Sequence, residues 1–143
     1  MVNSLLNAVT TRLGTAFGTN YRYYVEDVQQ GITKPCFTID VLNPMQRSRS
    51  PRLYDRTVPL VVHYFSDSKQ KSKQDCYNMA ERVLEYLEYI PFENTMLRGE
   101  NISWQLIDDD VLQLFITYRF QTAMSQITED NMEEILGNIT HAK

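Results

Sequence analysis

Two runs of alternating apolar and polar residues constrain the fold of this chain more than any other feature. Residues 102–106 and 112–120 each place an apolar side chain at every second position, and three aspartates lie between them. The alternating apolar residues are Ile102, Trp104 and Leu106 in the first run, and Leu112, Leu114, Ile116, Tyr118 and Phe120 in the second. A period of two residues is typical of a strand with one buried face. The pattern predicts an antiparallel hairpin whose apolar face needs a covering layer.

Three further strands are predicted before this hairpin, at residues 21–27, 36–42 and 57–65. The third is apolar on both faces, and its Pro59 has no amide to donate, which favours an edge strand or a bulge. The second and third strands are interpreted as the arms of a long antiparallel hairpin, with residues 44–52 as its tip or extended loop.

Two amphipathic helices complete the pattern. Apolar residues recur with a helical period over residues 3–17, where Gly18 offers a permissive stop. A second helical period covers residues 76–87, and Pro91 prevents its continuation.

The order of elements predicts an α+β fold. We expect a mainly antiparallel sheet of about four to five strands with two helices packed on one face. With 143 residues, one domain is expected at residues 1–122. Residues 123–143 are predicted to be a polar C-terminal tail, with a short amphipathic segment at Met132, Ile135, Leu136 and Ile139.

Composition argues against several classes of protein. No apolar run reaches the roughly 18 residues that span a bilayer, so no membrane contact is expected. The N-terminal residues lack the pattern of a secretory signal, so folding is expected to begin in a cytoplasm. Cys36 and Cys76 are too few and too far apart for a structural zinc site, and both are predicted to be ordinary buried or half-buried thiols.

Catalytic and metal-binding signatures are weak. Asp108, Asp109 and Asp110 could suggest a divalent cation, but consecutive turn residues point apart, and a polar hairpin turn is the preferred interpretation. His63 lies within a predicted strand, and no nucleophile or phosphate-binding motif accompanies it. No catalytic residue, metal or cofactor is therefore expected, and an enzyme is not the preferred interpretation.

The stretch "QRSRSPRLYDR" at residues 46–56 concentrates positive charge in a chain with a formal net charge of -4. Its arginines suit bidentate contacts with carboxylate or phosphate, and one tyrosine is interleaved. These residues are Arg47, Arg49, Arg52, Tyr54 and Arg56. Three interpretations stay open: a loop that contacts a protein, a solvated hairpin tip, and a contact with nucleic acid.

Four stretches, read in order, resemble the tail terminator (tail completion) proteins of tailed phages and phage-like particles. They are "YRYYVEDVQQGITKPCFTIDVLNP", "RLYDRTVPLVVHYF", "CYNMAERVLEYLEYI" and "LRGENISWQLIDDDVLQLFITYRF". The resemblance implies an α+β virion protein, assembled in the bacterial host cytoplasm, that forms a ring, usually a hexamer, on the head-proximal end of the tail tube. Its implied partners are other copies of itself, the tail tube protein, the head-completion proteins and, in contractile tails, the sheath protein.

A ring needs two different complementary patches on each subunit. We therefore expect the arginine stretch to contact acidic surfaces of a neighbour, with Asp108 to Asp110 as one candidate partner. The alternative is a head-tail connector protein whose arginine loop contacts DNA.

Overall fold

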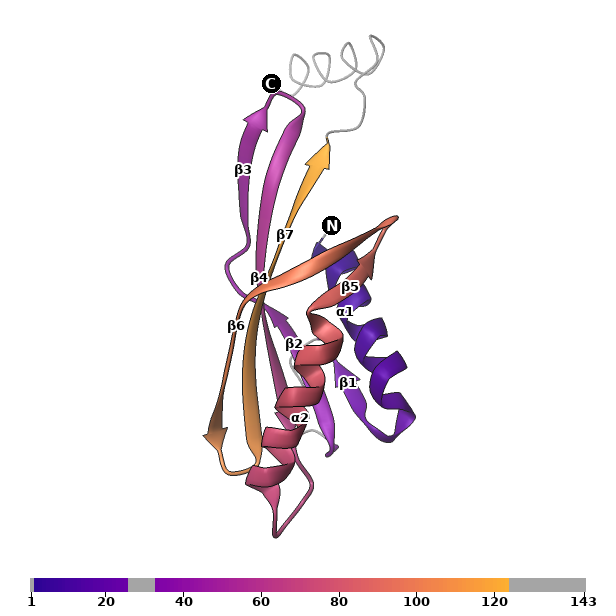
Figure 1. The fold of residues 1–143 in the computed structure, drawn as a ribbon, viewed down its shortest axis with the longest axis vertical. Helices are drawn as coiled ribbons and strands as arrows, with labels where there is room; N and C mark the ends of the chain where they lie inside the picture. Colours follow the sequence, from indigo (N-terminus) through magenta and orange to yellow (C-terminus); the bar gives the residue numbers. More distant parts are fainter. Residues whose placement is uncertain (1, 26–32, 124–143) are drawn as a thin grey trace, which may run out of the picture.

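A computed structural model describes residues 2–25 and 33–123 of the chain (Figure 1). In chain order the elements are α1 (Val2–Phe17), a 3-10 turn (Gly18–Asn20), β1 (Arg22–Tyr24), β2 (Cys36–Val41), β3 (Met45–Ser50), β4 (Leu53–Phe65), α2 (Ser72–Leu87), β5 (Tyr89–Phe92), β6 (Thr95–Asp108) and β7 (Val111–Ala123). No helix in these ranges is long and apolar enough to cross a membrane.

The strands form one curled sheet, which is larger than expected. Its order is β1-β2-β4-β7-β6-β5, and β3 pairs with the free end of β4. The α+β class is confirmed, but the expected four to five strands are wrong, because β3 and β5 add to them. β3 is polar apart from Met45, and β5 is a short apolar run that contains a proline, so the sequence of neither shows the alternation that identifies a strand. The sheet is also mixed, since β1 runs parallel to β2.

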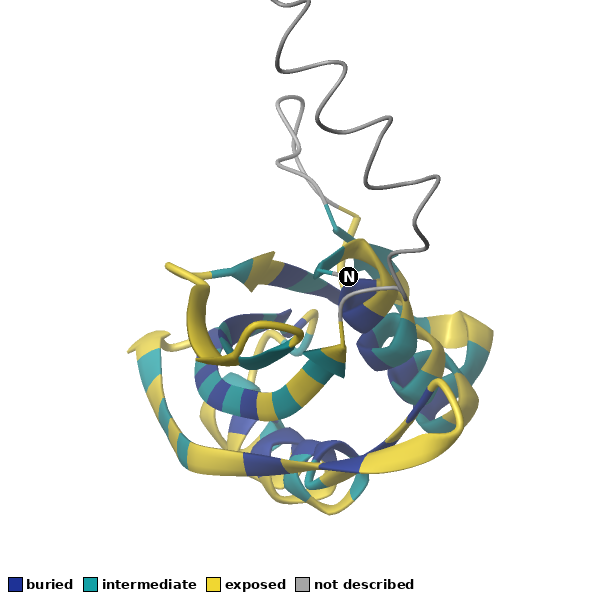
Figure 2. Cartoon of the chain, turned by 90° about the horizontal axis from the view of Figure 1, so that it is seen from above, coloured by how far each residue is buried: buried dark blue, intermediate teal, exposed yellow. Residues whose placement is uncertain are grey.

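Both helices cover the same face of the sheet. The apolar stripe of α1 and that of α2 join one buried cluster with alternate residues of β2, β4 and β7. Figure 2 shows the resulting alternation of buried and more exposed bands along the strands. Residues such as Leu60, Leu114 and Tyr118 have no exposed surface, as expected for positions between sheet and helices. The expectation of two helices on one face is thus confirmed for the described residues.

β4 is a central strand, not the edge strand that Pro59 suggested. It pairs with β7 along its whole length, with β2 at residues 60–65 and with β3 at residues 53–57. Pro59 lies between the ladders with β2 and β3. There its carbonyl accepts a hydrogen bond from the amide of Leu42 at 2.8 Å. The missing donor therefore falls at the one point of β4 where the neighbouring strand is interrupted.

Polar contacts, part-buried at the start of α2 and buried at its end, hold this helix. At its start, Asp75 accepts hydrogen bonds from the hydroxyls of Tyr64 (2.7 Å) and Ser66 (2.5 Å). At its end, the carbonyl of Leu87 accepts from the buried hydroxyl of Tyr118 at 2.6 Å. These bonds tie the helix to β4 and β7 and so define the rigid base from which the longer strands project.

The predicted tail at residues 123–143 begins at the last residue of β7. Its amphipathic segment lies outside the described residues, so the boundary at residue 122 stays a prediction.

Candidate functional site

The arginine stretch forms a hairpin that projects beyond the helices (Figure 1). We call residues 45–56, which comprise β3, the turn and the start of β4, the arginine hairpin. Every residue of β3 is exposed. In the ladder Arg47 lies opposite Asp55, and the guanidinium of Arg49 lies 3.7 Å from the carboxylate of Asp55. The residues that sequence analysis expected to form a loop are therefore a paired extension of the sheet.

A groove of about 480 Å³ runs along this extension, and we call it the arginine groove. Its lining combines two predicted arginines with a third from β7. The lining residues are Met45, Arg47, Asp55, Arg56, Thr57, Arg119, Phe120 and Gln121. The Nε of Arg56 is buried and has no hydrogen-bond partner among the described residues. Three guanidinium groups against one aspartate make the groove suitable for an anionic group of a partner.

Arg119 lines the arginine groove but was not among the candidate site residues expected from the sequence. It lies opposite Thr57 in the β4–β7 ladder, although more than sixty positions separate them in the chain. Its side chain also lies 3.5 Å from the carboxylate of Glu100. Alternation placed Arg119 on the polar face of a strand, but only the register between β4 and β7 brings it beside the hairpin.

Arg52 and Tyr54 do not line the arginine groove. Arg52 lies in the turn between β3 and β4, and Tyr54 pairs with Ser48 in the ladder. Arg49 is likewise outside the groove lining, nearer the tip of the hairpin. The five residues predicted together are thus spread over the groove, the tip and the strand.

Asp109 and Asp110 form the turn between β6 and β7, as predicted, and Asp108 is the last residue of β6. We call these three residues the acidic turn. Lys34 lies 3.0 Å from Asp110, and Lys73 lies 3.5 Å from Asp109. The hydrogen bond from Lys34 lowers the pKa of Asp110 below its ordinary value. No cluster of three potential metal ligands occurs within residues 2–25 and 33–123. Two of the three carboxylates are therefore already balanced by lysines of the same chain.

The arginine hairpin and the acidic turn lie at opposite ends of the molecule (Figure 1). β4 and β7 pair from Leu53 opposite Ala123 to Phe65 opposite Val111. Twelve steps of about 3.3 Å separate the two ends by about 40 Å. Contact between the arginines and these aspartates within one chain is thus excluded, and only two different subunits can bring them together.

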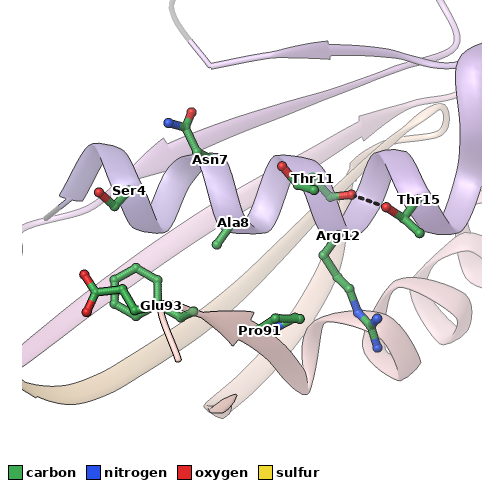
Figure 3. A pocket seen from close by; sticks show the side chains of 9 residues that line it. Ser4, Asn7, Ala8, Thr11, Arg12, Thr15, Pro91 and Glu93 are labelled. Atoms are coloured by element: carbon green, nitrogen blue, oxygen red, sulfur yellow. Dashed lines mark hydrogen bonds between the residues drawn. The ribbon is translucent and has the colours of Figure 1, made fainter. Parts of the chain in front are cut away.

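A second groove, of about 410 Å³, lies between α1 and the end of β5 (Figure 3). Its arginine, Arg12, points from α1 toward α2 and donates to the carbonyl of Tyr86 at 3.0 Å. Thr11 is occupied within the helix, accepting through its carbonyl from Thr15 at 2.9 Å. The lining offers small polar side chains but no pairing of a nucleophile with a base.

His63 and the cysteines have structural surroundings. The ring of His63 lies 3.3 Å from the amide of Gln113, and burial lowers its pKa. Cys36 and Cys76 are fully buried and free, which confirms the prediction of buried thiols. Burial raises the pKa of both thiols, that of Cys76 to about 11. A thiol held protonated and out of solvent is a poor nucleophile.

Comparison with known proteins identifies the family. A family profile described as "Phage tail terminator protein" matches residues 4–132, which is most of the chain. A search of curated proteins found no match. One similar solved structure is 13% identical over 88% of this chain and 97% of its own, with a TM-score of 0.42, a likeness too weak to support an argument. On the family match, the chain belongs to the phage tail terminator proteins, structural components of the virion tail.

Proposed function

We propose that this protein forms a ring that caps the head-proximal end of the phage tail tube. In that position it stops polymerisation of the tube and provides a joining surface for head-completion proteins and, if the tail is contractile, for the sheath protein. The observation that carries the proposal is the family match over residues 4–132. The ring, which the resemblance makes a hexamer, would assemble in the bacterial host cytoplasm.

The distribution of charge supports head-to-tail assembly. The arginine hairpin and the acidic turn are about 40 Å apart, so each subunit presents two different charged ends. A cyclic ring uses two different complementary surfaces on every subunit. We infer that the hairpin arginines contact acidic groups of a neighbouring subunit or of a tail protein. Asp108 is the best candidate within the acidic turn, because Lys34 and Lys73 already face the other two aspartates.

Electron microscopy of purified tail tubes incubated with labelled protein tests the proposal. The expected result is a band at one end of each tube, with rotational symmetry that reports the number of subunits. In solution, light scattering should give about 101 kDa for six subunits of 16.8 kDa. Label distributed along the tubes, or absent from their ends, contradicts the proposed function.

A matched pair of variants tests the contribution of the arginines. Arg47→Ser with Arg49→Ser removes two positive charges from the hairpin, and Lys69→Ser with Lys71→Ser removes two from an exposed segment before α2. Ring formation or tube capping is expected to weaken in the arginine variant and to persist in the lysine variant. The fourfold replacement of Arg47, Arg49, Arg52 and Arg56 by serine should abolish it. Normal assembly of the fourfold variant would refute the role of the hairpin.

The arginine groove favours one second candidate, a connector protein whose arginines contact DNA. Arg47, Arg56 and Arg119 line the groove against a single aspartate, and the Nε of Arg56 has no partner among the described residues. Duplex binding measured by fluorescence anisotropy should then fall steeply with added salt, because phosphate contacts release counterions. Absence of binding at low salt removes this candidate.

A further inference from the structure

The projecting end of the sheet has two strand edges without a described partner. We call this part the three-stranded extension: β3, residues 53–57 of β4 and residues 119–123 of β7. Within it, β4 pairs with β3 on one side and with β7 on the other. β6 follows β7 only as far as Tyr118, opposite Gly99, and residues 95–98 then pair with β5 instead. The outer edges of β3 and of residues 119–123 therefore have no strand partner within the described ranges.

The extension has little packing of its own to stabilise it. All six residues of β3 are exposed, and Met45 is 62% exposed. The aromatic contact that reaches the extension joins Phe120 to Phe92, with ring centroids 5.1 Å apart. Small sheets need an apolar face or further strands for stability, and open strand edges tend to pair with other chains. The extension is thus suited to receive an additional strand.

The two open edges match each other in length and direction. β3 offers six residues, and the free part of β7 offers the five from Arg119 to Ala123. Both strands are antiparallel to β4, so they run parallel to each other. A rotation about an axis along the strands keeps their direction, and it brings β7 of one copy beside β3 of the next.

We propose that neighbouring subunits join by parallel β-addition, in which β3 of one copy pairs with residues 119–123 of β7 of the next. This inference rests on the proposed ring and names the surfaces that close it. Backbone hydrogen bonds would link the subunits, and the arginines on β3 would restrict pairing to the correct partner. Six copies would contribute about eighteen strands, and closed barrels of that size leave an open channel.

Charge and length favour this pairing over the other open edge. With the strands at equal height, Met45 of one copy lies level with Arg119 of the next, and Arg47 with Gln121, so no like charges oppose each other. Residues 101–108 of β6 also have no second strand partner in the part of the chain that the structure describes, but the outermost strand on the far side of the sheet is β1, which has only three residues. A ring joined through those edges would leave most of β6 unpaired.

Disulfide trapping on the full-length protein tests the proposal. Thr122→Cys is combined in turn with Gln46→Cys, Ser48→Cys and Ser50→Cys, which covers shifts of two residues in either direction. In one chain β4 separates β3 from β7, which places the Cα atoms about 9.6 Å apart. A disulfide needs Cα atoms within about 7 Å, so any bond must join two subunits. The native thiols are fully buried and do not compete.

Oxidation of at least one double variant, free or bound to tail tubes, should give a ladder of covalent oligomers that ends at the ring. Each single variant, and a Ser48→Cys with Ser103→Cys control on exposed strands, should give no ladder. If the wild-type protein forms rings but no double variant cross-links beyond these controls, the β-addition is refuted and the proposed function stands. If the wild-type protein forms no ring alone or on tubes, the proposed function fails, and this inference fails with it.

Discussion

Three glycines lie in different surroundings, so the same substitution by alanine should change stability by different amounts and in different directions. A Cβ on buried Gly99 would clash with Cδ1 of Ile116, and it would lie 2.8 Å from Cγ1 of Ile116 and 3.1 Å from the carbonyl oxygen of Leu87. Ile116 is 1% exposed, so it has little room to move. Overpacking of this kind costs about 1 to 3 kcal/mol, and we expect Gly99→Ala to lower the free energy of unfolding by about 2 kcal/mol.

Two other glycines serve as matched controls. Apart from its chain neighbours and the adjacent backbone of α1, no atom lies within 4 Å of a Cβ on Gly14, so Gly14→Ala should stabilise by about 0.5 to 1 kcal/mol through helix propensity. Gly18 has equal space but a φ of 81°, so Gly18→Ala should destabilise by about 1 kcal/mol. The same substitution thus measures overpacking at Gly99, helix propensity at Gly14 and backbone strain at Gly18.

Urea denaturation followed by the fluorescence of Trp104 gives these free energies, measured at two protein concentrations because assembly would stabilise the folded state. Ile116→Val removes Cδ1, the nearest atom. It should cost about 1 kcal/mol in the wild type and less in the Gly99→Ala background. The reasoning is refuted if Gly99→Ala is neutral, or if the two substitutions are additive.

Three further predictions concern single groups. Tyr118→Phe should lower the free energy of unfolding in urea by about 1 to 2 kcal/mol, because the Leu87 carbonyl loses the hydroxyl that donates to it at 2.6 Å. Tyr77→Phe, at a side chain that is 46% exposed, should leave the free energy of unfolding unchanged. Equal effects of the two substitutions would contradict this prediction. Lys34 lowers the pKa of Asp110 in the folded protein below its ordinary value of 3.8. Their ion pair therefore contributes to the free energy of unfolding above pH 3.8, and this contribution disappears as the pH falls through the folded pKa. Both side chains are about 40% exposed, so the free energy of unfolding should fall by only about 0.5 kcal/mol on acidification. This decrease should be smaller in high salt and absent in Asp110→Asn. A decrease that occurs above about pH 5 would contradict the role of Asp110. The fully buried thiols, with the pKa of Cys76 at about 11, should resist Ellman's reagent at pH 8 until urea unfolds the chain, and rapid reaction of the folded protein would contradict this.

The elements that sequence analysis predicted well are those whose burial follows a simple period. The stripe of α1 and the alternation of β7 each face one core, so local sequence was enough to find them. β3 and β5 were missed for the same reason, because a fully exposed strand and a four-residue strand with a proline carry no such pattern. The prediction of an edge strand from Pro59 was wrong. A proline lacks the amide donor of a ladder, so it indicates a position without a strand partner on one side. Such a position occurs at the edge of a sheet, and it also occurs inside a sheet where the neighbouring strand is interrupted, as it is between β2 and β3.

The candidate site was predicted only in part. A dense group of arginines near a predicted turn was visible in the sequence, and so was the acidic turn of the last hairpin. The balancing of that turn by Lys34 and Lys73, and the arrival of Arg119 beside the arginine hairpin, depend on residues distant in the chain. No local pattern encodes such contacts.

By itself, the sequence determined the α+β class, the two helices, the last hairpin, the buried thiols and the family resemblance. All of these follow from local periodicity or from the types and order of residues. The tertiary structure decided that the arginines lie on a paired hairpin rather than a loop and that about 40 Å separates them from the acidic turn. It also decided that two strand edges beside them have no strand partner among the described residues. The physical reason is that pairing partner and register are properties of two segments at once, and either segment read alone contains only half of that information.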